Sequence, residues 1–323
     1  MSRPATVTLN RSAPAVKKSG PRWTYRARRV LQPYAMLSPA IILFLAFLAG
    51  PILYTVVLSF QKLEISGLGL GAGARKTVFA GFSNYIDSLS DPALVESVGR
   101  VAVYGVILIP ALLLLALLFA LLVDSPRTRA SRFSRIAIFL PVAVPAVIST
   151  LLWGFLYLPG VSPLSFLLGQ VGLTAPNPLE DWPIVIAIAN IGLWGAVGFN
   201  MVVIYTALRG IPSDIYEAAR LDGANERQVA LRIKIPLVVP SLILTGLFSM
   251  VGVLQVFTEP TLLQPLTNSI PTTWSPLMKV YRDAFIKGDI NSAAATSVVI
   301  AAVTLSLSFI FLRVVQRRAF AQE

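Results

Sequence analysis

Residues 101–123 read VAVYGVILIPALLLLALLFALLV, a stretch without a formal charge that Arg100 and Asp124 bracket. A helix needs about 20 predominantly apolar residues to cross the hydrocarbon core of a bilayer, so this stretch is long enough to span one. Five further charge-free runs have comparable lengths, at about residues 35–60, 136–158, 183–207, 235–258 and 290–312. The pattern predicts an all-α, polytopic membrane protein with six transmembrane helices.

The composition of the whole chain agrees with this prediction. Only 13% of its 323 residues are charged and 55% are hydrophobic, whereas an ordinary soluble domain carries about 25% charged residues. The chain has no cysteine and no histidine, which excludes disulfides, thiolate zinc sites, cysteine nucleophiles and histidine bases. It also lacks the glycine-rich phosphate loop of ATPases, and the six runs contain no Asp, Glu, Lys or Arg. We therefore predict no catalytic residue and no metal site, and a proton-coupled carrier or voltage sensor is disfavoured.

The Lys and Arg residues are distributed unevenly between the two sides of the predicted membrane. Twenty lie in the N-terminal tail, in the loops after the second and fourth runs and at the C-terminus, whereas six lie in the opposite loops. Positive charge marks the cytoplasmic side, so we predict a multi-pass protein of the bacterial plasma (inner) membrane with both termini cytoplasmic. The net charge of +12 then reflects orientation in a lipid bilayer, and we expect no nucleic-acid partner.

Residues 1–30 are rich in basic and small polar residues, and we expect a disordered cytoplasmic tail there. Residues 31–318 are expected to form one membrane domain with a cytoplasmic loop at about 211–234. Four neutral polar or aromatic residues fall at membrane depth, namely Asn190, Trp194, Asn200 and Gln255. They can serve either in hydrogen bonding between packed helices or in a pocket for an uncharged, hydroxyl-rich ligand.

The loop after the fourth run is the most informative segment and reads GIPSDIYEAARLDGANERQVALRIKIPLVVP from Gly210 to Pro240. Asp214 with Glu217 predicts a capping box that starts a short helix, and Gly223 is placed to end that helix. Asn225 with Gln228 then predicts the cap of a second helix that leads into the fifth run. The physical pattern alone leaves two roles open, an interfacial helix resting on lipid and a helix that docks on another protein.

The same loop resembles the EAA signature of the membrane subunits of binding-protein-dependent ABC importers. The signature residues are Glu217, Ala218, Ala219 and Gly223, followed by Ile233 through Pro236, although Lys234-Ile235 stands where the family more often has an uncharged residue and then Leu. Further motifs typical of the carbohydrate-uptake subfamily occur in the same order along the chain: Leu37-Ser38-Pro39-Ala40, Gly50-Pro51, Leu58-Ser59-Phe60, Gly81-Phe82-Ser83-Asn84-Tyr85, Phe139-Leu140-Pro141, Val197-Gly198-Phe199-Asn200 and Gln255-Val256-Phe257.

The resemblance implies a permease subunit that forms half of a translocation pathway and has no enzymatic activity of its own. The loop helix would dock on a separate ATPase through Glu217, Ala218, Ala219, Asp222 and Gly223. The implied partners are a dimer of ABC ATPases, a second homologous permease subunit and an extracellular or periplasmic solute-binding protein. ATP and Mg would be bound by the ATPase, so we expect no cofactor in this chain.

The resemblance also implies a sugar or related neutral, hydroxylated solute. The corresponding pathway segments contain Trp194, Phe199, Asn200, Gly252, Gln255 and Val256. Alternatives are an ABC permease for glycerol phosphate or a polyamine, or a passive channel or secondary carrier. A phosphate-bearing solute would call for Arg or Lys in the pocket, and the six runs have none. The segment Pro265 to Pro276 departs from the Gly-Gly-Pro-rich pattern of the family, which leaves the conformation of that outer loop open.

Overall fold

The structure is a computed structural model that describes residues 22–65, 75–125, 131–173 and 176–319. It divides into two units, Met1–Tyr54 and Thr55–Glu323, which are described separately. Of the tail expected to be disordered, residues 1–21 lie outside the described residues. Residues 22–30 are helical, contrary to the prediction. Once a helix exists, each added residue gains a hydrogen bond, so the helix continues past the apolar boundary into the basic segment.

The first unit contains one helical segment. Helix α1 (Arg22–Phe44) continues through a π-helical turn, η1 (Leu45–Ala49), into α2 (Gly50–Ser59), whose last residues belong to the second unit. Pro33–Ser59 is long and apolar enough to cross a membrane, and none of the residues in its most apolar window is buried. A helix that is apolar all round requires an apolar environment on every side.

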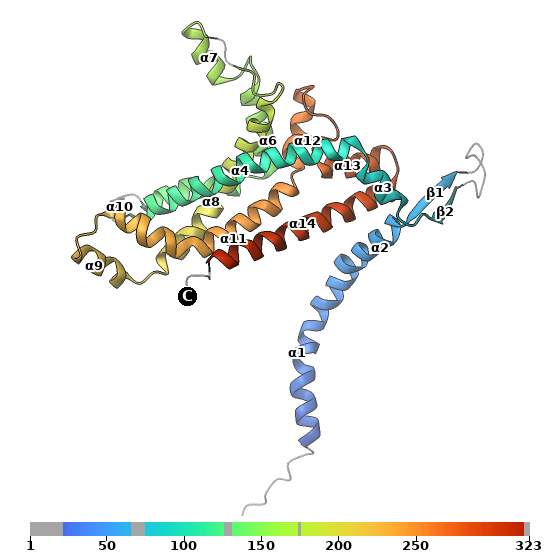
Figure 1. Cartoon of the computed structure of the whole chain (residues 1–323), viewed down its shortest axis with the longest axis horizontal. Helices are drawn as coiled ribbons and strands as arrows, with labels where there is room; N and C mark the ends of the chain where they lie inside the picture. The colour runs from blue at the N-terminus through green and yellow to red at the C-terminus, as the bar shows by residue number, and fades with distance from the viewer. Residues whose placement is uncertain (1–21, 66–74, 126–130, 174–175, 320–323) are drawn as a thin grey trace, which may run out of the picture. The chain divides into compact units, whose positions relative to one another are not determined.

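The second unit is a bundle built around four long helices: α4 (Pro92–Asp124), α8 (Pro183–Arg209), α11 (Ile235–Leu254) and α14 (Ile290–Ala319). Helix α4 packs along α8 and α11, and α11 also packs against α8 and α14 (Figure 1). Two apolar clusters lie at different levels of the bundle. One includes Ile188 and Val253, and the other includes Met201 and Val238.

The third predicted span is bent in the structure. Helix α5 (Ser131–Phe139) and the 3-10 turn η2 (Leu140–Ala143) meet α6 (Ala146–Tyr157) at an angle of 95°. Pro145 lacks an amide hydrogen and forces the preceding residue into an extended conformation, so the helix restarts in a new direction. Within the described ranges, five helices are long and apolar enough to cross a membrane and the bent pair is a sixth candidate. The predicted all-α, polytopic class is confirmed.

Shorter elements connect or extend the long helices. Residues Gln61–Ile65 (β1) and Arg75–Phe79 (β2) pair as an antiparallel hairpin that the all-α prediction did not include. The remaining elements are α3 (Ser83–Leu89), α7 (Pro163–Gln170), α9 (Ser213–Leu221), α10 (Glu226–Val229), η3 (Ala230–Lys234), α12 (Thr258–Leu263), η4 (Gln264–Leu266), α13 (Pro276–Tyr281) and η5 (Arg282–Ile286). Helices α9 and α10 lie at one end of the bundle and α12 and α13 at the other (Figure 1). We call these the α9 end and the α13 end.

The segment before α13, whose conformation the sequence left open, is held by specific contacts. The Thr267 hydroxyl donates to the Leu179 carbonyl, and the Arg100 guanidinium donates to the Thr273 carbonyl at 3.0 Å. The Trp274 side chain next to it is only 1% exposed. The loop is therefore anchored to the bundle on both sides of residue 270.

An ion cluster fixes α13 to the start of α4. The Lys279 ammonium lies 2.6 Å from Asp283 and 3.0 Å from Asp91, and its side chain is almost completely buried. Burial alone would raise the pKa of Asp283, but its bonds to Lys279 and Arg282 outweigh burial and hold that pKa below its usual value. The pKa of Asp91 is lowered in the same way, since the Ala93 amide and Lys279 outweigh burial. Both carboxylates are therefore charged in the folded protein at neutral pH.

Candidate functional site

Helix α9 begins two residues earlier than the sequence predicted. Pro212 occupies the N-cap position and no side chain caps the helix there, so the predicted capping box of Asp214 with Glu217 is wrong. Pro212 is extended at ψ 137°, and its fixed φ allows the helix to start directly at Ser213. Asp214 then lies in the first turn, where its carboxylate faces the positive end of the helix dipole.

The end of α9 and the start of α10 follow the predicted chemistry. The Ala224 amide donates to the Ala219 carbonyl at 2.9 Å, and Gly223 has a φ of +83°. This is the Schellman arrangement, in which the residue after the helix adopts a left-handed conformation. Asn225 and Gln228 form the predicted reciprocal capping box with distances of 2.8 and 2.9 Å. Two caps in sequence therefore define the turn between the helices.

The predicted docking residues lie on an exposed part of this loop. Glu217, Ala218, Asp222 and Gly223 are exposed and Ala219 is half-buried, and α9 contains no fully buried residue. The large apolar side chain of Leu221 is 89% exposed on the same short helix. Figure 1 shows α9 standing out from the long helices at its end of the bundle. Small and apolar exposed residues beside a carboxylate form a surface that another protein can approach closely.

The six predicted pathway residues do not converge on one site. Val256 is buried with Val253 in the apolar cluster nearer the α13 end, whereas Phe199 and Asn200 adjoin Met201 in the cluster nearer the α9 end. Gln255 and Gly252 are exposed at the end of α11, and Phe199 is 51% exposed on α8. The structure thus separates these residues along the length of the bundle.

Two of these residues have packing roles in this structure. The Asn200 side chain is buried and donates to the Ala196 carbonyl of its own helix at 3.0 Å. Beside it, a Cβ on Gly198 would lie 2.8 Å from the Cα of Phe139. Glycine at this position therefore lets the chain between α5 and η2 pack directly on α8. Val256 likewise contributes an apolar side chain to the core.

Trp194 belongs to a group of aromatic residues that sequence reasoning missed in part. Its ring meets that of Trp153 edge-on at 6.2 Å, and Trp153 lies 5.7 Å from Tyr157. The Asn190 amide donates to the Tyr157 hydroxyl at 2.8 Å. Trp153 and Tyr157 are four residues apart in the third run, a helical spacing that could have indicated a shared face. Together these four residues offer aromatic faces and one amide.

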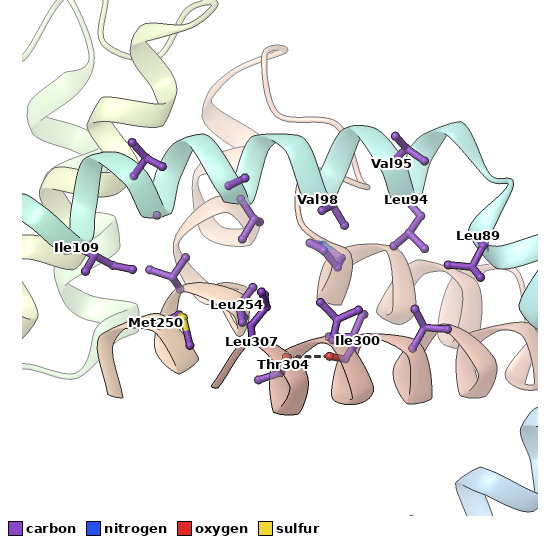
Figure 2. Close-up of a pocket in the computed structure, with 18 of the residues that line it drawn as sticks. Leu89, Leu94, Val95, Val98, Ile109, Met250, Leu254, Ile300, Thr304 and Leu307 are labelled. Carbon is purple, nitrogen blue, oxygen red and sulfur yellow. Dashed lines mark hydrogen bonds between the residues drawn. The ribbon is translucent and has the colours of Figure 1, made fainter. Parts of the chain in front are cut away.

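A cavity of about 660 Å³ lies between α4, α11 and α14. Figure 2 shows Val98 of α4, Met250 of α11 and Leu307 of α14 around the same space. Thr304 is the one residue in its lining with a polar side chain, and its hydroxyl donates to the Ile300 carbonyl at 2.8 Å. Because this lining is apolar apart from the one hydroxyl, the cavity does not suit a solute with many hydroxyl groups.

The comparisons with known proteins agree on one family. Residues 113–320 match the family described as binding-protein-dependent transport system inner membrane component. The probable ABC transporter permease protein YurN of Bacillus subtilis is 30% identical over 283 residues, which cover 85% of this chain and 93% of that protein. The sn-glycerol-3-phosphate transport system permease protein UgpA of Brucella abortus is 28% identical, with coverage of 88% of this chain and 95% of that protein.

The fold is also shared with a solved structure. The crystal structure of a bacterial ABC transporter involved in the import of the acidic polysaccharide alginate contains a chain that matches this one with a TM-score of 0.76 and 22% identity. The match covers 92% of this chain and 99% of that chain, so it extends well beyond the residues matched by the family model. The chain belongs to the family of inner membrane components of binding-protein-dependent ABC transport systems.

Proposed function

We propose that this chain is the permease subunit of an importer for a sugar or a related neutral, hydroxylated solute. The observation that carries the proposal is the exposed, doubly capped α9 loop with Glu217, Ala218 and Ala219 at its centre, in a chain of this family. Several relatives are named as sn-glycerol-3-phosphate permeases, so the choice of a neutral solute rests on the absence of Lys and Arg from the six charge-free runs. The chain has no catalytic role in the proposal.

In this proposal α9 docks on a separate ABC ATPase, which binds ATP and Mg. Glu217 pairs with a basic group of the ATPase, and the small side chains of Ala218 and Ala219 allow close approach of its backbone. Two ATPase subunits serve two permease subunits, this chain and a homologous one, and a solute-binding protein delivers the solute on the other side. Closure of the ATPase dimer moves α9 and thereby changes which side of the pathway is open.

The proposal places the α9 end in the cytoplasm together with both termini. Helix α14 runs towards the α9 end, so the last described residues lie on the same side as the docking loop. The bias of twenty basic residues against six supports this orientation. The α13 end then faces the solute-binding protein.

For the solute we propose contacts with Trp194 and the aromatic residues beside it, and with the exposed amide of Gln255. Aromatic faces stack on sugar rings and amides bind hydroxyl groups. Phe199 and Asn200 lie nearer the α9 end and Val256 is buried, so these three are not included as solute contacts. Gly252 has no side chain that could bind a hydroxyl group and is not included either.

Glycerol phosphate is the second candidate solute, because several related proteins carry that name. A phosphate group calls for an Arg guanidinium, which can form two parallel hydrogen bonds with it, or for a Lys ammonium at the site. Arg100 is the basic residue within α4, and it is already bonded to Glu96 at 2.7 Å and to the Thr273 carbonyl. Lys279, beside the start of α4, is paired with Asp91 and Asp283. This arrangement favours the neutral solute.

Two experiments test the proposal. Purification of the tagged chain from its own host should yield an ABC ATPase, and Glu217→Lys should reduce its recovery severalfold. Arg227→Glu is the matched control, since Arg227 lies in the same loop outside α9 and is exposed.

The second experiment concerns the solute. The solute-binding protein should retain neutral mono- or oligosaccharides rather than sn-glycerol 3-phosphate in a binding panel. Equal recovery of the ATPase with Glu217→Lys would refute the docking assignment, and selective retention of glycerol phosphate would refute the solute class.

A further inference from the structure

A buried ion pair joins two of the long helices beside the α9 loop. The Lys234 ammonium, at the start of α11, lies 2.6 Å from the carboxylate of Asp124, the last residue of α4, and both side chains are less than a tenth exposed. By contrast, the side chains of the pair between Arg220 and Glu226 in the same loop are 44% and 35% exposed. Burying two charges costs free energy unless their geometry is good, so this pair fixes the two helix ends against each other.

A π-helical turn places Lys234 in this position. The turn η3 (Ala230–Lys234) widens the helix just before α11. Val229 and Val238 are each only 1% exposed, and Lys234 lies five residues after the first and four before the second. The wider turn therefore aligns all three side chains on the buried face. Such turns are rare and occur frequently at functional sites.

Helix α9 reaches the ion pair through one side chain. The Tyr216 ring lies over the Lys234 ammonium at 5.1 Å from the ring centroid. Its hydroxyl is enclosed and bonds no group in the described part of the chain. Burial and the nearby Asp124 carboxylate raise the pKa of Tyr216, against a smaller opposite effect of Arg209. The ring therefore faces a charged centre, and a cation over an aromatic face is an attractive contact.

We infer that the Asp124–Lys234 ion pair, with the Tyr216 ring over it, is the joint that transmits displacement of α9 to α4 and α11. The inference rests on the proposed docking of an ATPase at α9. Because α9 contains no fully buried residue, its contact with Lys234 is a defined mechanical link to the bundle. Lys234 is tied in turn to Asp124, so a pull on Tyr216 acts on both long helices. Tyr216, Lys234 and Asp124 are thus positioning residues for transport.

The experiment follows movement of α11 in the complex of the full chain with its co-purified ATPase. The chain has no cysteine, so Leu244→Cys, on an exposed position of α11, carries a single environment-sensitive fluorophore. MgATP with vanadate is the probe, and the fluorescence change is the readout. Tyr216→Phe keeps the ring and should keep the full response. Tyr216→Leu removes the ring and should lower the response about three- to tenfold, while the ATPase remains bound.

A second variant distinguishes a loss of transmission through the ion pair from a loss of folding stability. Replacing both partners by apolar residues, as in Asp124→Leu with Lys234→Met, should preserve folding because neutral replacements of a buried pair are tolerated. The response should nevertheless be lost. Arg232→Met is the matched control, because it removes an exposed cation from the same π-helical turn, and it should respond normally.

The possible results are distinct. A full response from folded Tyr216→Leu would overturn the joint, and so would an equal loss with Tyr216→Phe and Tyr216→Leu. If the double variant folds and responds fully, the ion pair has no part in transmission and the inference fails. Absence of any bound ATPase in the unmodified complex would instead refute the proposed function, and the joint with it.

Discussion

Substitution of Gly223 offers the sharpest test of the α9 loop, because its cost can be worked out from the structure. A Cβ added at this residue meets no heavy atom within 4 Å, and φ is +83°. The cost is therefore conformational and not steric contact with neighbours. A residue with a Cβ loses about 1–2 kcal/mol in the left-handed region, and Asn tolerates this region better than other residues. We expect Gly223→Asn to be nearly neutral and Gly223→Val to be the most damaging.

The effect on docking follows from the low stability of the loop. Helix α9 has nine residues and none is fully buried, and isolated helices of this length are marginal in water. A loss of 1–2 kcal/mol therefore reduces the population of the capped loop by about 5- to 30-fold, since 1.4 kcal/mol corresponds to a factor of 10. The apparent affinity for the ATPase should fall by the same factor, because only the competent fraction binds.

The assay is a titration of the purified permease variants with the ATPase, in detergent and at fixed nucleotide concentration. The affinity for the ATPase should be highest with glycine at position 223 and should decrease in the order Asn, Ala, Val. Thermal stability of the bundle should stay unchanged, since Gly223 is exposed at the end of the loop. Equal affinity of the Asn and Val variants would refute the role assigned to the left-handed conformation.

Three further predictions concern the rest of the molecule. Lys279→Met leaves Asp91 and Asp283 without their buried cation, and it should lower the free energy of unfolding in detergent by about 3–5 kcal/mol. The pKa values of both aspartates are lowered in the folded state. The stability that the two carboxylates contribute is therefore fully present at pH values above their pKa in the unfolded chain, and it is lost as the pH falls through their pKa in the folded state. Stability measured between pH 6 and pH 2 should therefore fall less in the variant, and an unchanged acid profile would contradict this reasoning. Single cysteines at Ser90 and Ser213, both exposed, should react with an impermeant reagent from opposite sides, only Ser90→Cys labelling in intact cells. Gln255→Leu should reduce uptake severalfold without loss of assembly, because an amide-to-ligand bond contributes about 1 kcal/mol, and normal uptake would limit Gln255 to a packing role.

The features that the sequence predicted well are those decided by neighbouring residues. Charge-free runs mark the long helices, since length and composition alone decide whether a segment can cross a bilayer. The capping box of Asn225 and Gln228 and the positive φ of Gly223 also depend on local chemistry. The error at Asp214 had a local cause as well. Both Pro212 and Asp214 could occupy the N-cap position of α9, and in the structure Pro212, with its fixed φ, occupies it.

The pathway residues could not be placed in this way, because depth within a bundle depends on how helices run past one another. Phe199 is ten residues from the end of α8, so it lies about 15 Å along the axis from that end at 1.5 Å per residue. Gln255 follows the last residue of α11, about 30 Å from the start of that helix. Both helices have one end at the α9 loop, which puts the two side chains at different levels. No local pattern in the sequence contains this offset.

Burial of charged residues bears on the orientation that the sequence predicts. The count of twenty basic residues against six treats every Lys and Arg as solvated, yet Lys234 and Lys279 are each buried against a carboxylate. A buried ion pair carries no net charge and adds little attraction to one side of the membrane. One of these lysines comes from each side of the count, so their removal leaves nineteen against five. The asymmetry survives, and the predicted cytoplasmic position of the α9 loop does not depend on either buried cation.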